Sequence, residues 1–174
     1  MKSSIRPNGR WREMGRADLS AVARLAAAVH PLYPEKDDVF AERLHLYPAG
    51  SRVLTDEAGG IVGYAVSHPW RYAAIPTLDS ALVALPERAD CFYIHDIALL
   101  PAIRGRGAAQ AAVALLADHA ARAGFARMAL VAIAGTQAFW QRQGFHCVET
   151  PKLDAKLASY DASARYMSRA LGQL

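Results

Sequence analysis

One segment constrains the fold of this chain more than any other: an apolar run that leads into two arginines set between glycines. It reads YIHDIALLPAIRGRGAAQAAVALLADHA, from Tyr93 to Ala120. Residues 91–100 are apolar and rich in aromatic and aliphatic side chains, which favours a buried strand. The alanine-rich stretch that begins near Gly107 ends at Gly124, which is typical of a helix followed by a glycine. The segment therefore predicts a strand, a tight loop and a helix in succession.

The loop between this strand and this helix has the composition of an anion-binding turn. The first N–H groups of a helix have no acceptor within the helix, and the helix dipole adds partial positive charge there. Glycines permit positive φ angles and leave room for an anion, while arginines donate charge-assisted hydrogen bonds to its oxygens. The pattern is neither a Walker loop nor a Rossmann fingerprint, so an ordinary strand–helix turn with surface arginines stays open as the alternative. The residues concerned are Arg104, Gly105, Arg106, Gly107, Ala108 and Ala109.

The residues before this segment predict two helices, a hairpin and an irregular stretch. Apolar residues follow Asp18 at helical spacing, with Asp18 as the expected N-cap. A second, shorter helix is expected to stop before Pro48. Two β-rich runs joined by a loop with two glycines are typical of a hairpin, and the stretch after them has room for one short helix near Thr77. The predicted ranges are helices at 17–29 and 34–47, a hairpin at 51–69 and an irregular stretch at 70–90.

The residues after Gly124 continue the alternation of strands and helices. A strand is followed by a short helix that ends at Gly144, and two further strands are expected to pair around Cys147. The chain thus has a helical start, a hairpin, and then strand–helix–strand–helix–strand, which predicts a mixed α/β (α+β) sheet in one domain over residues 1–174. The predicted ranges are strands at 125–133, 145–150 and 164–171 and a helix at 136–143.

The composition is that of a soluble globular domain. Of the 174 residues, 53% are hydrophobic and 21% are charged, and the net charge of +4 suits a small anionic ligand as well as nucleic acid. No secretory signal and no apolar run long enough to span a bilayer are found. Cys91 and Cys147 are too few and too far apart for a disulfide framework, so we expect reduced thiols in a cytoplasmic protein. No hydrolase elbow, H-E-x-x-H pair or EF-hand loop occurs, and we expect no metal ion.

Two motifs resemble the signature of the GNAT superfamily, the acetyl-CoA-dependent N-acetyltransferases. Arg104, Gly107 and Ala109 fill the three fixed positions of its motif Q/R-x-x-G-x-G/A, and IALLP stands where the family commonly has LAVxP. The segment AFWQRQGF, residues 138–145, is similar to the family's second landmark, FYxxxGF. Both occur in the family's order with a strand between them, and the predicted elements match along nearly the whole chain. The chain is therefore identified as a member of this superfamily.

The resemblance implies a fold and a place for acetyl-CoA. The family has a mostly antiparallel sheet with a splayed central strand pair and helices on both faces. Its members bind the pyrophosphate of coenzyme A on backbone amides of the loop that corresponds to Arg104–Ala109. The pantetheine arm then runs beside Ile97 to Leu99, where the N–H of Leu99 would stabilise the oxyanion of a tetrahedral intermediate. Direct attack of an amine on the thioester needs, besides, a group that removes a proton.

Two residues on the predicted strand are candidates for that base. YIHDIAL is similar to HLHALAV of the arylalkylamine N-acetyltransferases, in which the second histidine is the base; His95 matches it. It is also similar to YIYDLAV of aminoglycoside 3-N-acetyltransferases, in which an aspartate serves the amine; Asp96 matches it. Neighbours on a strand point to opposite faces, so only one should face the site unless a bulge intervenes. We favour His95, because a histidine ordinarily titrates near neutral pH. A structural role, His95 bonded within the core or Asp96 capping backbone, is the alternative for each.

Trp140 departs from the family pattern, in which many members have a tyrosine that protonates the leaving thiolate. An indole N–H is no practical acid, so this role does not carry over to Trp140. Water, Tyr93 or Tyr64 is left to replace it, or the thiolate leaves unassisted. We expect Trp140 to pack beside the pantetheine arm, with a core aromatic as the alternative.

The acceptor side is expected in two loops rich in proline and aromatic residues, HPLYPEKDD and SHPWRYAAIPTLDSALVALPERAD. A cationic amine with an apolar body suits such walls, and FWQRQGFH resembles FYQRFGFH of the arylalkylamine enzymes. We therefore expect a small primary amine as acceptor, with a protein amine or a non-catalytic acetyl-CoA sensor as alternatives, and neither nucleic acid nor a membrane as partner. The sequence leaves a homodimer open. The acidic residues of the two loops include Glu35, Asp37, Asp38 and Asp79.

Overall fold

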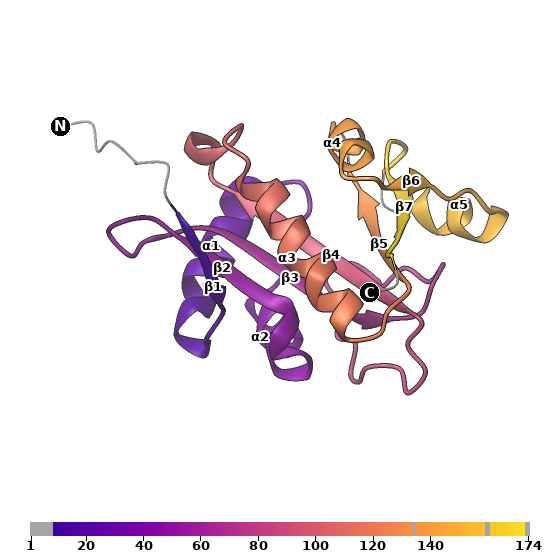
Figure 1. The fold of residues 1–174 in the computed structure, drawn as a ribbon, viewed down its shortest axis with the longest axis horizontal. Helices are drawn as coiled ribbons and strands as arrows, with labels where there is room; N and C mark the ends of the chain where they lie inside the picture. The colour runs from indigo at the N-terminus through magenta and orange to yellow at the C-terminus, as the bar shows by residue number, and fades with distance from the viewer. Residues whose placement is uncertain (1–8, 134, 159–160, 173–174) are drawn as a thin grey trace.

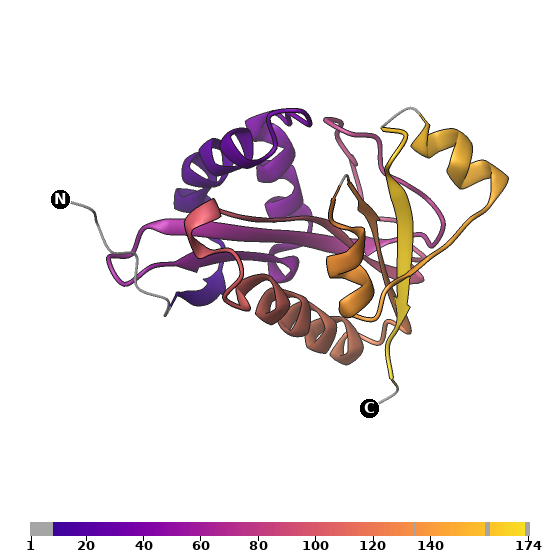
Figure 2. The ribbon, with the colours of Figure 1, turned by 90° about the horizontal axis from the view of Figure 1, so that it is seen from above.

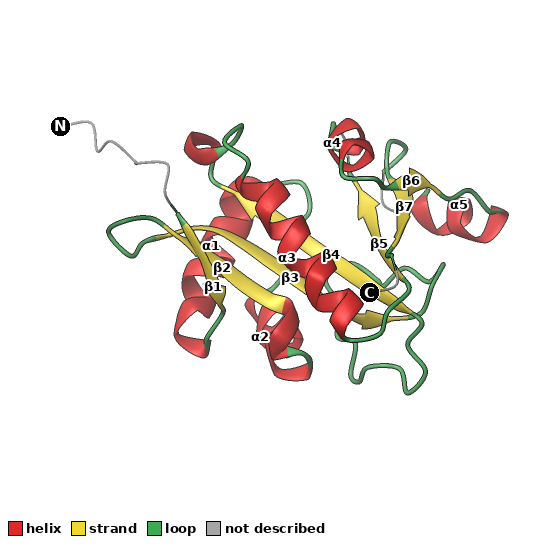
Figure 3. Ribbon diagram, in the orientation of Figure 1, coloured by secondary structure: helices red, strands yellow, loops and turns green. Residues whose placement is uncertain are grey.

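The computed structural model describes residues 9–133, 135–158 and 161–172. Its centre is a seven-stranded sheet with the order β1-β2-β3-β4-β5-β7-β6 (Figures 1 and 3). All neighbouring strands are antiparallel except β4 and β5. The strands are β1 (Arg10–Glu13), β2 (Ser51–Thr55), β3 (Ile61–Trp70), β4 (Cys91–Leu99), β5 (Arg127–Ala132), β6 (His146–Cys147) and β7 (Arg165–Ala170). The helices are α1 (Leu19–Val29), α2 (Asp37–Leu46), α3 (Ala108–Arg122), α4 (Gln137–Arg142) and α5 (Pro151–Leu157).

Helices cover both faces of the sheet. Figure 2 shows α1 and α2 on one side of the central strands and α3 on the other. The α3 side buries alanine and leucine residues of the helix against Phe92 and Ile94 of β4. The opposite side buries Val22 and Phe40 of the first two helices against β3 and Ala98. The expected fold class, a mixed and mostly antiparallel sheet with helices on both faces, is confirmed.

The two central strands part soon after they meet. β4 and β5 pair only at Phe92 with Met128 and at Tyr93 with Ala129. β4 then continues to Leu99 and β5 to Ala132, but the two strands do not pair with each other again. The expected splayed pair is thus confirmed, and a gap opens along the second half of β4.

Backbone groups of β4 face this gap. Leu100 donates its N–H to the carbonyl of Val62, 2.9 Å away on the β3 side. Hydrogen-bonded and non-bonded pairs alternate along an antiparallel ladder. In the observed register, therefore, Ala98 bonds to β3, whereas Ile97 and Leu99 turn their N–H and carbonyl groups away from β3. The N–H groups of both residues thus point into the gap, whereas the carbonyl of Leu99 accepts a hydrogen bond from Nε of Arg104.

The structure corrects three expectations about the secondary structure. Residues 71–90 contain no helix, so the short helix expected near Thr77 is wrong. Side chains of α2 hold this segment instead: Arg43 donates to the carbonyl of Ser80, and Glu42 accepts the N–H groups of residues 82 and 83. The first element of the described residues is strand β1, not a helix; β1 is an exposed edge strand without an alternating apolar pattern. The strand expected at 145–150 is only two residues long.

That strand is short because α5, which the sequence analysis did not predict, follows it closely. Thr150 caps α5 by accepting the N–H of Leu153. Asp18 precedes α1 as expected, but its carboxylate binds the N–H of Gly15 and the guanidinium of Arg12 and does not cap the helix. Among the described residues, no helix has the length and apolarity needed to cross a membrane.

Candidate active site

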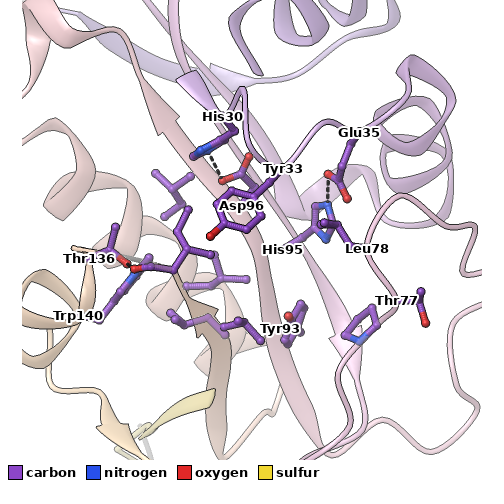
Figure 4. Close-up of a pocket in the computed structure, with 16 residues that line it drawn as sticks. His30, Tyr33, Glu35, Thr77, Leu78, Tyr93, His95, Asp96, Thr136 and Trp140 are labelled. Carbon is purple, nitrogen blue, oxygen red and sulfur yellow. Dashed lines mark hydrogen bonds and ion pairs between the residues drawn. The ribbon is translucent and has the colours of Figure 1, made fainter. Parts of the chain in front are cut away.

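A cavity of about 120 Å³ lies where β4 parts from β5. The middle of β4 forms its floor, and the ends of β5 and α4 form one side (Figure 4). The loop between α1 and α2 and the irregular segment 71–90 form the other sides. The two loops that the sequence analysis assigned to the acceptor therefore do meet at one pocket.

A β-bulge in β4 brings His95 and Asp96 to the same pocket. Val66 pairs with Asp96, but the next residue of β3, Ser67, pairs with Ile94, so that His95 is an extra residue in β4. Such an insertion shifts the alternation of side chains by one position. Both His95 and Asp96 consequently line the cavity. Of the two arrangements that the sequence left open, the structure has the one with a bulge.

His95 forms a buried pair with Glu35 from the loop between α1 and α2. The Nε2 atom of His95 lies 2.7 Å from Oε2 of Glu35 (Figure 4), and the two side chains are 8% and 7% exposed. A carboxylate accepts a hydrogen bond, so Nε2 carries a proton, and Nδ1 is the nitrogen that has the lone pair whenever the ring is neutral. The sequence analysis named Glu35 only as one acid of the acceptor loop and missed its pairing with His95.

Asp96 is held by two other side chains. His30 donates from Nε2 to Oδ1 of Asp96 over 3.0 Å, and the hydroxyl of Tyr64 donates to Oδ2. Burial alone would raise the pKa of Asp96, but the hydrogen bonds and charge of His30, together with Tyr64, hold that pKa below its ordinary value. The carboxylate is thus ionised with both oxygens engaged. His30, at the end of α1, was not among the predicted site residues.

The Arg-Gly loop has the geometry that its composition predicts. Gly105 and Gly107 have φ angles of +75° and +80°, and a Cβ atom at either would meet no other atom within 4 Å. Gly107 is the N-cap of the 15-residue helix α3, and no side chain caps the helix N–H groups. Ala108 and Ala109 keep the first turn small, and the indole of Trp11 donates to the carbonyl of Ala108. The loop is therefore an open cradle that fits a phosphate group.

Arg104 links this cradle to the floor of the cavity. Its Nε atom donates to the carbonyl of Leu99, 3.0 Å away, which is one of the backbone groups turned toward the gap. The order along the chain is thus the cavity, the free edge of Ile97–Leu99, and then the loop from Arg104 to Ala109. The predicted cofactor residues form one continuous track from the cavity to the start of α3.

Trp140 closes the cavity on the side of α4. It is 8% exposed, packs against Phe139 and Phe145 at centroid distances of 5.0 and 5.4 Å, and lines the cavity. It is both a core aromatic and a wall residue, so the two interpretations of Trp140 do not exclude each other.

Two polar contacts join the cavity walls to the C-terminal part of the chain. The hydroxyl of Tyr33 donates to Asp161, which follows α5. Lys156 of α5 donates to the hydroxyl of Thr77, 3.2 Å away. Tyr33 and Thr77 both line the cavity, so these contacts span its rim.

Comparison with known proteins agrees with this geometry. A sequence profile described as the acetyltransferase (GNAT) family matches residues 19–145, well over half of the chain. No curated protein matches the chain in sequence.

Solved structures match the chain over nearly its whole length. Ard1 from Thermoplasma volcanium has a TM-score of 0.72 and 18% identity, with 94% of this chain and 98% of that chain covered. The ribosomal-protein-S18-alanine N-acetyltransferase from Escherichia coli has a TM-score of 0.68 and 17% identity, with 96% of each chain covered. A phosphinothricin acetyltransferase from Sinorhizobium meliloti in complex with AcCoA has a TM-score of 0.66 and 20% identity, with 94% and 89% covered. These likenesses show the fold, and together with the profile match they establish that the chain belongs to the acetyltransferase (GNAT) family of enzymes.

Proposed function

We propose that the enzyme transfers the acetyl group of acetyl-CoA to the primary amine of a small molecule, with His95 as the general base. The observation that carries this proposal is the buried His95–Glu35 pair beside the gap between β4 and β5. A general base must lie within hydrogen-bond reach of the proton that it takes from the nucleophile. His95 lies four residues before Leu99, on the strand along which the thioester would arrive.

The cradle at the start of α3 supports the binding of acetyl-CoA. The open glycines and uncapped N–H groups from Gly105 to Ala109 would hold the diphosphate. The backbone groups of Ile97 would then pair with the pantetheine arm as a strand pairs with its neighbour. The N–H of Leu99 would donate to the thioester carbonyl and stabilise negative charge on that oxygen.

Glu35 lets His95 act as a base without leaving an unpaired positive charge buried in the protein. When Nδ1 of His95 takes the proton of the attacking amine, the ring becomes an imidazolium. Glu35 is already bonded to Nε2 and neutralises this cation at 2.7 Å. Glu35 also fixes the ring orientation, which keeps Nδ1 as the nitrogen with the lone pair.

The walls of the cavity support a small amine as acceptor. The carboxylates of Glu35 and Asp96 favour a cation over an anion, and Leu78 and Tyr93 supply apolar surface. The contacts of Tyr33 and Thr77 across the rim restrict entry by a polypeptide. The structural neighbours differ in the acceptors that their names give, so the fold alone does not select an acceptor.

The test is release of coenzyme A from acetyl-CoA, measured with a panel of small amines and, in parallel, with peptides that have a free N-terminus. We expect turnover with a subset of the amines, preferably those with an apolar or aromatic body. Turnover with peptides alone would replace the proposal by protein N-acetylation. Tight binding of acetyl-CoA by calorimetry without turnover in either set would make the protein a sensor.

A further inference from the structure

The cavity holds a second imidazole–carboxylate pair, to which the proposed function gives no part in proton transfer. His30 and Asp96 lie beside His95 and Glu35, and both histidines line the same cavity (Figure 4). In each pair Nε2 is bonded to a carboxylate, which leaves Nδ1 of each ring for another partner. Resting on the proposed function, we propose that His30 is the general acid that protonates the thiolate of coenzyme A as it leaves.

The order of groups along β4 supports this division of roles. The cradle for the diphosphate follows the end of β4, so the pantetheine arm reaches the cavity past Leu99 and then Ile97. The sulfur must arrive before the acetyl carbon, and the amine attacks from the far side of that carbon. His30 is anchored on Asp96, the residue next to Ile97. His95 lies one residue farther from the cradle and is held by Glu35. The imidazole of His30 is thus the one on the sulfur side.

The charges around His30 favour its protonated form. Burial alone would lower the pKa of His30, but the hydrogen bond and charge of Asp96 on β4 raise it above the ordinary value. Glu35 on the neighbouring loop acts in the same direction, whereas Arg104 after β4 opposes it. Tyr64 on β3 reaches His30 only through Asp96. An imidazolium near neutral pH is the form that an acid requires.

Other proton donors at the cavity are less suited to this task. The indole of Trp140 is no practical acid. The hydroxyl of Tyr64 is bonded to Asp96, and burial raises the pKa of Tyr64 well above its ordinary value. The hydroxyl of Tyr33 is bonded to Asp161. Tyr93 is 5% exposed and lies two residues farther from the cradle than His95, which places it on the amine side of the thioester. His30 therefore supplies the acid that the absence of a tyrosine at position 140 leaves missing.

The proton balance of this scheme closes. The bound ammonium group first loses one proton to solvent, and the neutral amine nitrogen then forms a bond with the acetyl carbon while the C–S bond breaks with its electron pair going to sulfur. Nδ1 of His95 takes one proton from the nitrogen, and Nδ1 of His30 gives one proton to the sulfur. The products are the N-acetyl amine and the free thiol, and the two histidines return to their starting forms by proton exchange with water.

The test is His30→Gln, which retains a side-chain N–H donor for Asp96 but cannot titrate. His146→Gln, at an exposed histidine of β6, is the matched control. Both are assayed with acetyl-CoA and with its analogue in which oxygen replaces the thioester sulfur. An alcoholate needs a proton to leave far more than a thiolate does, so the variant's defect must grow with the oxygen ester. We expect His30→Gln to slow kcat about tenfold with acetyl-CoA and at least about tenfold more with the oxygen ester.

Equal defects with the two donors would overturn the role of His30, because a merely structural change affects both alike. Unaltered rates would overturn it as well. The pH profile gives a second readout: the alkaline loss of wild-type kcat should vanish in His30→Gln and shift to lower pH in Asp96→Asn. A thermal melt checks that each variant is folded, and calorimetry checks that each variant binds acetyl-CoA. If the wild-type enzyme transfers acetyl to no amine, the proposed function itself fails. If the wild type is active and the two donors show equal defects in His30→Gln, only the role of His30 fails.

Discussion

Glu35 Oε2 and His95 Nε2 lie 2.7 Å apart although 60 positions separate the two residues in the chain. We expect Glu35→Gln to lower kcat at least about tenfold, because the amide accepts the same hydrogen bond but cannot neutralise an imidazolium. His95→Ala should lower kcat about a hundredfold or more. Steady-state kinetics with the preferred amine checks both, and KM for acetyl-CoA should stay unchanged. Glu87→Gln, at an exposed site of segment 71–90, is the control. Wild-type kcat in His95→Ala would remove His95 from the mechanism.

The cradle at the start of α3 can be tested with two matched glycines. Gly107 has a φ angle of +80° and Gly59, in the distant β2–β3 turn, has +82°; neither has an atom within 4 Å of a Cβ position. Alanine should destabilise both to the same degree, about 1–2 kcal/mol, through the left-handed backbone alone. Only Gly107→Ala places a methyl group where the diphosphate would lie, so only it should weaken acetyl-CoA binding, about tenfold. Urea denaturation and calorimetry measure the two effects. Equal affinities in the two variants would argue against the cradle.

His68 should make the enzyme sensitive to acid. Its side chain is fully buried in β3, and burial lowers the pKa of His68 to about 3. Below the unfolded-state pKa of about 6.5, the unfolded chain binds a proton that folded His68 does not. Stability is therefore lost as the pH falls from about 6.5 toward 3, by roughly 1.4 kcal/mol per pH unit from this residue.

The measurement is urea denaturation of the wild type and of His68→Phe at several values between pH 7 and pH 4. Taking the difference between the two proteins removes the contribution of all other titrating groups. The variant should lose less stability on acidification, and the exposed-site variant His146→Gln should follow the wild type. Parallel curves for wild type and His68→Phe would show that His68 takes up its proton without unfolding.

The contact of Tyr33 with Asp161 should affect the acceptor and not acetyl-CoA. It joins the α1–α2 loop to the chain after α5 at the rim of the cavity, away from the cradle. We expect Tyr33→Phe and Asp161→Asn to raise KM for the amine several-fold. Stability should change little, because the contact lies at the rim of the cavity, where solvent screens it. Asp154→Asn, on the exposed side of α5, serves as control. A rise in KM for acetyl-CoA in place of the amine would contradict this assignment.

The sequence predicted those elements whose structure depends on residues close together in the chain. The glycines at 105 and 107 require a loop, the alanine-rich stretch requires a helix, and the apolar run before them requires a buried strand. These three elements lie in succession and form the cradle and its approach. The paired glycines at 59 and 60 likewise defined the β2–β3 hairpin.

The rest depends on contacts between distant residues. Glu35 pairs with His95, and His30 with Asp96, across 60 and 66 positions; the sequence located their loop but not the partners. The segment around Thr77 is held by side chains of α2, which override its own turn and helix preferences. β1 is a strand only because the edge of β2 is there to receive it, since its exposed residues carry no apolar alternation.

The extra residue in β4 has a consequence for the tolerance of this strand to change in length. Replacing His95 removes its imidazole and keeps the bulge, whereas deleting His95 would remove the bulge itself. Ile94 and Asp96 already pair with Ser67 and Val66, so the shortened strand would pair without a bulge and Asp96 would stay at the cavity with His30 and Tyr64. A single-codon deletion at this position should therefore remove the proposed base and keep the fold, whereas a deletion elsewhere in the second half of β4 would move side chains to the opposite face.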